Sequence, residues 1–145
     1  MEIGTNDWSN FLINQAKIID IQLDHTQNHL FAIHAMELIK WNHKINITTI
    51  TDPVEVASSH FLDSLVPARF IPSDATMLDI GSGGGFPGIP LKVFLPKLSV
   101  TLIDASRKKT SFLKHVIRSL KLEHIEALHM RAEDLAIQPL SLIHI

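Results

Sequence analysis

Cysteine is missing from all 145 residues of the chain. Its absence excludes a disulfide scaffold, a zinc site built on cysteine and a cysteine nucleophile, and it fits a reducing compartment. No apolar run approaches the roughly 20 residues that a membrane span requires. Glu2, Asn6 and Asp7 stand where a signal peptide would carry basic residues. We therefore expect a soluble, cytoplasmic protein with no membrane partner.

A surplus of positive charge is also missing, because the net charge is −2. The chain as a whole does not have the electrostatic character of a nucleic-acid-binding protein, so any RNA binding would depend on local basic patches. Arg107, Lys108 and Lys109 form the densest such cluster. The same cluster is also compatible with an ordinary solvated helix start.

The nine histidines do not form a recognisable metal-binding pattern. His25 and His29 are four residues apart and His34 follows, but no carboxylate or further histidine completes a ligand set. We therefore expect no metal site.

Hydrophobic residues make up 46% of the chain, enough for one domain with a substantial core. Apolar residues in residues 1–72 recur with helical spacing, which predicts a helical N-terminal subdomain. The expected start signals are Asp7 as a cap, Asp24 with Gln27 as a capping box, and Asp52 before Pro53, with this last helix ending before Pro67.

The pattern after residue 72 alternates between strands and helices. Strands are expected over 76–80, over 98–103 ending in Asp104, and over 125–130, with helices over 89–94 and after the cap Ser106. Short connections between these elements predict an α/β fold with a doubly wound, Rossmann-like parallel sheet.

The expected organisation is an N-terminal helical subdomain over 1–72, a ligand-binding half with three strands over 73–138, and a tail of uncertain origin over 139–145. A three-stranded parallel sheet would leave its first strand as an exposed edge. Residues 140–145 are interpreted either as the start of a fourth strand or as a foreign tail on a truncated chain with an incomplete sheet. We favour the second interpretation.

The segment 77–91 carries five of the six glycines of the chain and follows the expected first strand. Glycine clusters where the backbone needs positive φ or where a ligand touches the main chain. Asp79 leads into this loop and would repel the pyrophosphate of a dinucleotide. S-adenosylmethionine (AdoMet) has no phosphate, and its sulfonium and ammonium groups suit a nearby carboxylate.

Two alternatives for this loop remain open. The residues from Gly83 to Gly88 satisfy G-x-G-x-x-G, so an NAD-binding domain has the same pattern. Asp79, Pro87 and Pro90 argue against that interpretation. A glycine-rich turn that binds no nucleotide is the third possibility.

Acidic residues follow the other two expected strands. Asp104 ends the second strand, about 20 residues after the glycine-rich residues 81–88, which we call the glycine loop. An acid in that position can accept hydrogen bonds from both hydroxyls of a ribose. Ala132 and Glu133 follow the third strand at the same sheet edge and are candidates to frame an adenine. Each of these positions is also compatible with a helix cap or a surface turn.

Several motifs together resemble those of the bacterial small-subunit rRNA methyltransferase G family, also called glucose-inhibited division protein B. The resemblance covers roughly residues 12–135. It rests on Lys40-Trp41-Asn42, Asn46-Ile47-Thr48, Asp52-Pro53, His60-Phe61-Leu62-Asp63-Ser64, the run from Asp79 to Leu91, Leu102-Ile103-Asp104-Ala105, Lys108-Lys109, Phe112-Leu113 and Arg131-Ala132-Glu133.

The resemblance implies a class I AdoMet-dependent methyltransferase that methylates N7 of a guanine in 16S rRNA, with the small ribosomal subunit as its partner. It implies that Gly81 and Phe86 line the AdoMet site and that Ala132 and Glu133 contact the adenosine end. Asp79, Gly83 and Asp104 are expected to support them. The family also places an arginine near the cofactor later in the chain, and no arginine follows Arg131 here.

Guanine N7 presents a lone pair and has no proton to lose, so the implied reaction requires no general base and no catalytic residue is assigned. The absence of cysteine excludes the cysteine-adduct route to carbon methylation. The alternatives to this function are an inactive, truncated module that binds AdoMet or adenosine, and an NAD-binding Rossmann domain.

Overall fold

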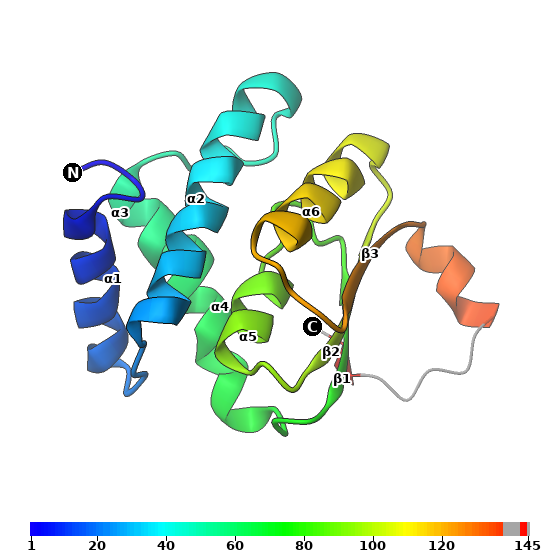
Figure 1. The fold of residues 1–145 in the computed structure, drawn as a ribbon. Helices are drawn as coiled ribbons and strands as arrows, with labels where there is room; N and C mark the ends of the chain where they lie inside the picture. The colour runs from blue at the N-terminus through cyan, green and yellow to red at the C-terminus, as the bar shows by residue number, and fades with distance from the viewer. Residues whose placement is uncertain (138–142, 145) are drawn as a thin grey trace.

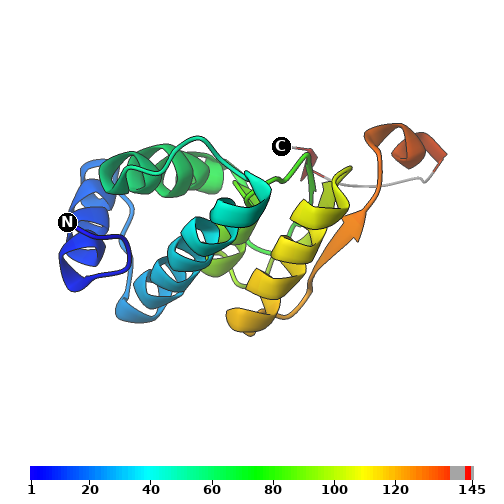
Figure 2. The same cartoon turned by 90° about the horizontal axis from the view of Figure 1, so that it is seen from above.

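The computed structural model describes residues 1–137 and 143–144. Helices α1 (Asn6–Ile18) and α2 (His25–Ile45) and a helical stretch over 53–70 lie on one side of the molecule. Helices α5 (Gly88–Phe94) and α6 (Arg107–Ser119) lie between these helices and a parallel sheet, as Figures 1 and 2 show.

The first two helices start at side-chain caps. Thr5 is extended, and its hydroxyl accepts a hydrogen bond from the backbone N–H of Trp8, so Thr5 caps α1 and the expected cap at Asp7 is wrong. Asp7 lies in the first turn instead, where its negative charge interacts favourably with the helix dipole. The capping box of Asp24 and Gln27 at the start of α2 is confirmed.

The helical stretch over 53–70 is continuous but irregular. Asp52 caps it as expected, since its carboxylate accepts hydrogen bonds from the N–H groups of Val54 and Glu55. The expected end before Pro67 is wrong, because Pro67 lies in the first turn of a 3-10 segment, where no backbone donor is needed. The segments are α3 (Pro53–Glu55), the π-helix η1 (Val56–Leu62), α4 (Asp63–Leu65) and the 3-10 helix η2 (Val66–Phe70).

The sheet has the strand order β3-β2-β1-β4, and all neighbouring strands are parallel. The predicted α/β parallel architecture is confirmed. The connections from β1 to β2 and from β2 to β3 contain α5 and α6, which both cover one face of the sheet (Figure 1). The strands are β1 (Thr76–Ile80), β2 (Ser99–Asp104), β3 (Ile125–His129) and β4 (Ile143–His144).

The first strand is not an edge of the sheet. Met77 pairs with Ile143 and Leu78 with His144, so β4 covers the side of β1 that β2 leaves free. The expectation of a bare first strand is wrong, because β4 adds to β1 on the side opposite β2 and β3. The 3-10 helix η3 (Ala132–Ile137) lies in the returning connection, away from α5 and α6 (Figures 1 and 2). Most of the tail expected over 139–145 lies outside the described residues.

One hydrophobic core runs from the N-terminal helices into the sheet. Trp8 is fully buried, packs edge-on against Phe61 at 5.7 Å, and donates its indole N–H to the carbonyl oxygen of Pro53. Phe112 of α6 and Leu102 of β2 belong to the same core. Within residues 1–137 and 143–144, no helix is both long and apolar enough to cross a membrane.

Candidate functional site

The loop after β1 turns sharply over the end of β2. The N–H groups of Gly81 and Ser82 both donate to the carbonyl oxygen of Ile103, at 2.8 and 3.1 Å. Gly81 adopts φ +72°, a left-handed conformation that side chains disfavour. A Cβ built on Gly81 would meet no atom within 4 Å, so this main chain borders open space.

Asp79 lies beneath the loop and does not face open space. Its side chain is 2% exposed, and its Oδ2 accepts a hydrogen bond from the N–H of Gly88 at 3.0 Å, at the start of α5. Burial raises the pKa of Asp79 to about 7, although the hydrogen bonds from Gly88 and Ser82 lower the pKa. A Cβ at Gly88 would overlap Leu102 Cδ2 and lie 2.9 Å from Asp79 Oδ2, which explains glycine at this position.

Asp104 joins the glycine loop to the start of α6. Its Oδ2 accepts a hydrogen bond from the N–H of Gly83 at 2.9 Å, and its Oδ1 accepts one from the N–H of Ser106 at 2.8 Å. Ser106 caps α6 as predicted, through its hydroxyl and the N–H of Lys109. Each carboxylate oxygen of Asp104 retains a second lone pair, so both can still accept a hydrogen bond from a ligand.

These elements border a cavity of about 450 Å³ at the carboxyl ends of β1, β2 and β3. Ligands of open parallel sheets bind at this edge, beside the point where the strand order reverses. Asp104 and Glu133 give the lining two acidic groups against one basic group, Arg131. The lining consists of Ile80, Gly81, Ile103, Asp104, Ala105, Met130, Arg131, Ala132 and Glu133.

Four of the seven site residues named from the sequence therefore lie around one cavity: Gly81, Asp104, Ala132 and Glu133. The other three do not line it. Gly83 acts through its hydrogen bond to Asp104, and Asp79 through its hydrogen bond to Gly88.

Phe86 is held between two histidines instead. Its ring stacks on His60 at 4.3 Å and 5° and on His34 at 4.7 Å and 13°. Because both faces of the ring are covered, Phe86 can offer a ligand only its edge. We call His34, Phe86 and His60 the aromatic stack.

The aromatic stack connects the N-terminal helices to the glycine loop. His34 is fully buried on α2, and its Nε2–H donates to the carbonyl oxygen of Gly84 at 2.7 Å. Burial lowers the pKa of His34 to about 4, so the ring is neutral at pH 7. His60 lies on the π-helix η1, a type of helix that is frequent at functional sites, and its Nε2 contacts the hydroxyl of Thr48 at 3.0 Å. Sequence reasoning assigned no role to either histidine, although His60 lies within a motif of the resemblance.

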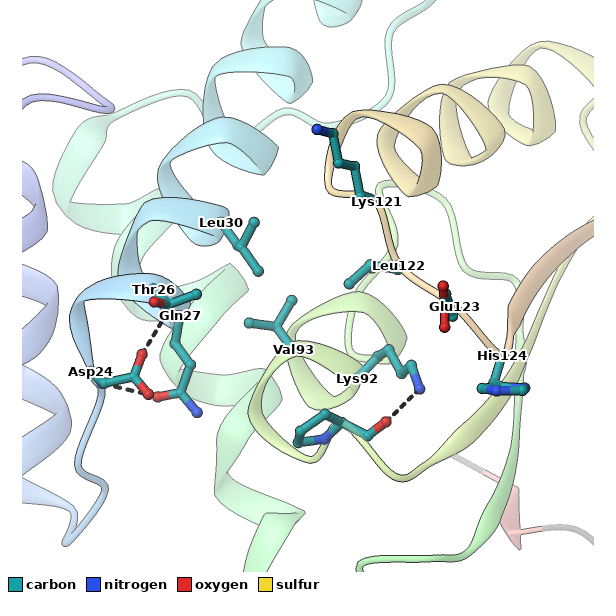
Figure 3. Close-up of a pocket in the computed structure, with 11 residues that line it drawn as sticks. Asp24, Thr26, Gln27, Leu30, Lys92, Val93, Lys121, Leu122, Glu123 and His124 are labelled. Carbon is teal, nitrogen blue, oxygen red and sulfur yellow. Dashed lines mark hydrogen bonds between the residues drawn. The ribbon is translucent and has the colours of Figure 1, made fainter.

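A second cavity, of about 440 Å³, lies beyond the start of β3 (Figure 3). Leu30, Val93 and Leu122 form an apolar surface there, and the ammonium of Lys92 donates hydrogen bonds to the carbonyl oxygens of Pro96 and Leu98. Burial lowers the pKa of Lys92, and those two carbonyls explain its inward position. This cavity lies at the amino ends of the strands, whereas the glycine loop lies at their carboxyl ends.

Metal-ligating side chains do not gather within the described part of the chain. No group of three or more histidines, aspartates or glutamates there has a geometry that could hold a metal ion. His25 and His29 line a pocket with Asn28 near the start of α2.

A parallel sheet in the order β3-β2-β1-β4, with a cavity at the carboxyl ends of its strands, is the arrangement of the class I methyltransferase fold. A solved structure with this fold superposes with a TM-score of 0.53 at 17% identity, covering 88% of this chain and 65% of the other. That protein, from Plasmodium falciparum, is described as a protein-L-isoaspartate O-methyltransferase and was solved with S-adenosyl-L-homocysteine.

The chain belongs to the rRNA small subunit methyltransferase G family, whose model matches residues 27–145. A relative of that name from Desulfitobacterium hafniense is 44% identical over 121 residues, 83% of this chain and 50% of the relative. Another from Desulforamulus reducens is 46% identical over 131 residues, 89% of this chain and 55% of the relative. The chain thus spans about half the length of these curated relatives.

Proposed function

We propose that this protein is an AdoMet-dependent methyltransferase that methylates N7 of a guanine in 16S rRNA. The observation that carries the proposal is the membership of residues 27–145 in the rRNA small subunit methyltransferase G family. Relatives with 44% and 46% identity carry the same name. The small ribosomal subunit is the proposed partner, and the cytoplasm, where ribosomes are found, is the proposed compartment.

The residues around the cavity fit AdoMet. Open space over the main chain of Gly81 leaves room for a ligand in contact with the backbone. Asp104 has spare lone pairs for ribose hydroxyls, and Ala132 with Glu133 borders the same cavity, where an adenine would lie. An acid in the position of Asp104 suits the ribose of AdoMet and of NAD equally. The NAD alternative is not favoured because the matching family and the similar relatives are all named as methyltransferases.

The other three site residues named from the sequence do not line the cavity, and we propose that they hold its lining residues and the glycine loop in place. Gly83 fixes one oxygen of Asp104, and Asp79 fixes the start of α5 through Gly88. Phe86 anchors the loop in the aromatic stack. We propose that residues 73–138 form the AdoMet-binding unit and that residues 1–72 form a helical subdomain that holds its glycine loop.

When bound, AdoMet supplies an electrophilic methyl group on its sulfonium. The lone pair of guanine N7 would accept this methyl group, and Gly81, Asp104, Ala132 and Glu133 around the cavity would hold AdoMet for the transfer. No group of the protein needs to remove a proton. The task of the cavity residues is to hold the donor so that N7 lies in line behind the methyl group, which alone accounts for a large part of such rate enhancements.

Two measurements test the proposal. Isothermal titration calorimetry on the 145-residue chain should show saturable AdoMet binding, and NADH fluorescence should not change on addition of the protein. Mass spectrometry of undermethylated small ribosomal subunits incubated with protein and AdoMet should show a new 7-methylguanosine. AdoMet binding without methyl transfer would favour a binding module, and saturable NADH binding would contradict the proposal.

A further inference from the structure

Helix α6 concentrates positive charge on a chain that is acidic overall. Arg107–Ser119 contains five lysines and arginines and no aspartate or glutamate. Since the whole chain carries −2 and α6 contributes +5, the remaining residues carry −7. The positive charge on this helix is therefore a local feature and does not reflect the composition of the whole chain.

Three of these cations form one line on the outer side of the helix. Arg107, Lys114 and Arg118 are all exposed, whereas Phe112, Leu113 and Val116 are buried against the core. Spacings of seven and eleven residues place the three cations within about 40° of arc and along about 16 Å of helix. We call Arg107, Lys114 and Arg118 the basic face.

The basic face has no acidic partner in the described part of the chain. The ion pair that α6 makes there joins His115 to Glu37 of α2 at 2.8 Å, and it leaves the arginines and lysines of α6 free. Unpaired cations on one helix face are available to bind an extended anion, whereas surface lysines paired with carboxylates are not.

The basic face starts at the rim of the cavity. Asp104 and Ala105 line the cavity, and Arg107 follows two residues after Ala105 at the first position of α6. Arg131 lines the same cavity and adds another exposed cation. A polyanion lying along α6 would therefore reach the cavity at one end.

We propose that the basic face binds phosphates of the RNA substrate and guides a nucleotide to the cavity, an inference that rests on the proposed function. Phosphate contacts by arginine and lysine supply most of the sequence-independent affinity of RNA-binding proteins. An anionic membrane is a poorer match, since surface helices that bind membranes insert large apolar side chains. The exposed large apolar residues of the described chain all lie outside α6.

A charge-reversal pair tests the proposal. The double variant Lys114→Glu/Arg118→Glu alters the basic face, and Lys17→Glu/Lys97→Glu changes two exposed lysines elsewhere by the same net charge. Filter binding to 16S rRNA at 0.1 M salt should show a loss of at least about tenfold in affinity for the first variant and within about threefold for the second. The slope of log affinity against log salt should flatten by about 1 to 2 for the first variant alone.

Calorimetry with AdoMet separates this proposal from the proposed function. Both variants should bind AdoMet as the unaltered chain does, because the four side chains do not line the cavity. Equal losses of RNA affinity in the two variants would contradict the role of the basic face in RNA binding and leave the proposed function intact. Absence of AdoMet binding in the unaltered chain would contradict the proposed function.

A milder variant, Lys114→Gln/Arg118→Gln, should weaken RNA binding in the same direction. Binding to phosphatidylglycerol vesicles that depends on α6, with unchanged RNA affinity, would also contradict the proposal.

Discussion

His34 and Gly84 lie 50 positions apart in the chain, and the Nε2–H of His34 donates a hydrogen bond of 2.7 Å to the carbonyl oxygen of Gly84. The contact joins helix α2 directly to the glycine loop. The other ring nitrogen, Nδ1, is buried without a partner among the described residues. The neutral ring therefore satisfies the loop carbonyl, whereas a charged ring would bury a second N–H, on Nδ1, that has no acceptor among the described residues.

The burial of His34 predicts a loss of stability in acid. The pKa of His34 is about 4 in the folded chain, below the ordinary 6.5, so between these pH values the unfolded chain binds more protons. The free energy of unfolding should fall by up to about 3 kcal/mol as the pH is lowered through this range. His34→Gln, which keeps an N–H donor, should remove that part of the pH dependence. Urea denaturation at pH 7.5, 5.5 and 4.5 measures it, with His25→Gln at an exposed position as control. An unchanged pH slope in His34→Gln would contradict the assignment.

Asp79 predicts the opposite pH dependence. Its pKa is raised from 3.8 to about 7, so between these values the folded chain binds more protons than the unfolded chain. This contribution to stability is fully present below pH 4 and is lost as the pH rises through 7, by up to about 4 kcal/mol. Asp79→Asn stays neutral and retains an acceptor for the N–H of Gly88. Its unfolding free energy relative to the unaltered chain should rise between pH 5 and pH 8. A constant difference over that range would show that Asp79 is ionised throughout.

Gly81 and Gly83 offer a matched pair for the proposed AdoMet site. Both have positive φ, +72° and +53°, so alanine at either position carries a similar backbone cost of about 1 kcal/mol. Only Gly81 lines the cavity. Gly81→Ala should weaken AdoMet binding more than tenfold in calorimetry, because its methyl group occupies space needed by the ligand, while Gly83→Ala should change it less than about threefold. Equal effects would point to loop strain and not to direct contact.

We propose two separable roles for Asp104: it fixes the loop through Gly83 and Ser106, and it accepts hydrogen bonds from the ribose of AdoMet. Asp104→Asn leaves one of its two oxygens as an acceptor, so one hydrogen bond to Gly83 or Ser106 is lost and stability should fall by about 1 to 3 kcal/mol. Affinity for S-adenosylhomocysteine should fall at least tenfold. The same substitution should lower the affinity for 2′-deoxy-S-adenosylhomocysteine clearly less, because that analogue lacks one of the ribose hydroxyls that would donate a hydrogen bond to the carboxylate. Ser106→Ala removes only the helix cap, so it should lower stability by about 1 kcal/mol and leave both affinities unchanged.

Local chemistry made much of the fold predictable. The capping box of Asp24 and Gln27, the cap at Ser106 and the bounds of β1 follow from residues within one or two turns of each other, and the structure confirms them. The grouping of Gly81, Asp104, Ala132 and Glu133 around one cavity was predictable for a topological reason, since parallel strands bring their carboxyl ends to one edge.

Long-range packing was not predictable in the same way. The stacking of Phe86 between His34 and His60 depends on how α2 and η1 pack on the loop, which no local pattern encodes. The pairing of β4 with β1 depends on a strand of two described residues, too short for a hydrophobic period. The choice of Thr5 over Asp7 as a cap depends on where the chain leaves its extended conformation.

The central position of β1 has a consequence for hydrogen exchange. Its amides lie between β2 and β4, whereas β3 has a neighbour on one side within the described sheet. Deuterium should therefore enter the backbone of β3 earlier than that of Met77 and Leu78. The glycine turn would thus remain anchored to a slowly exchanging strand while the outer part of the sheet opens.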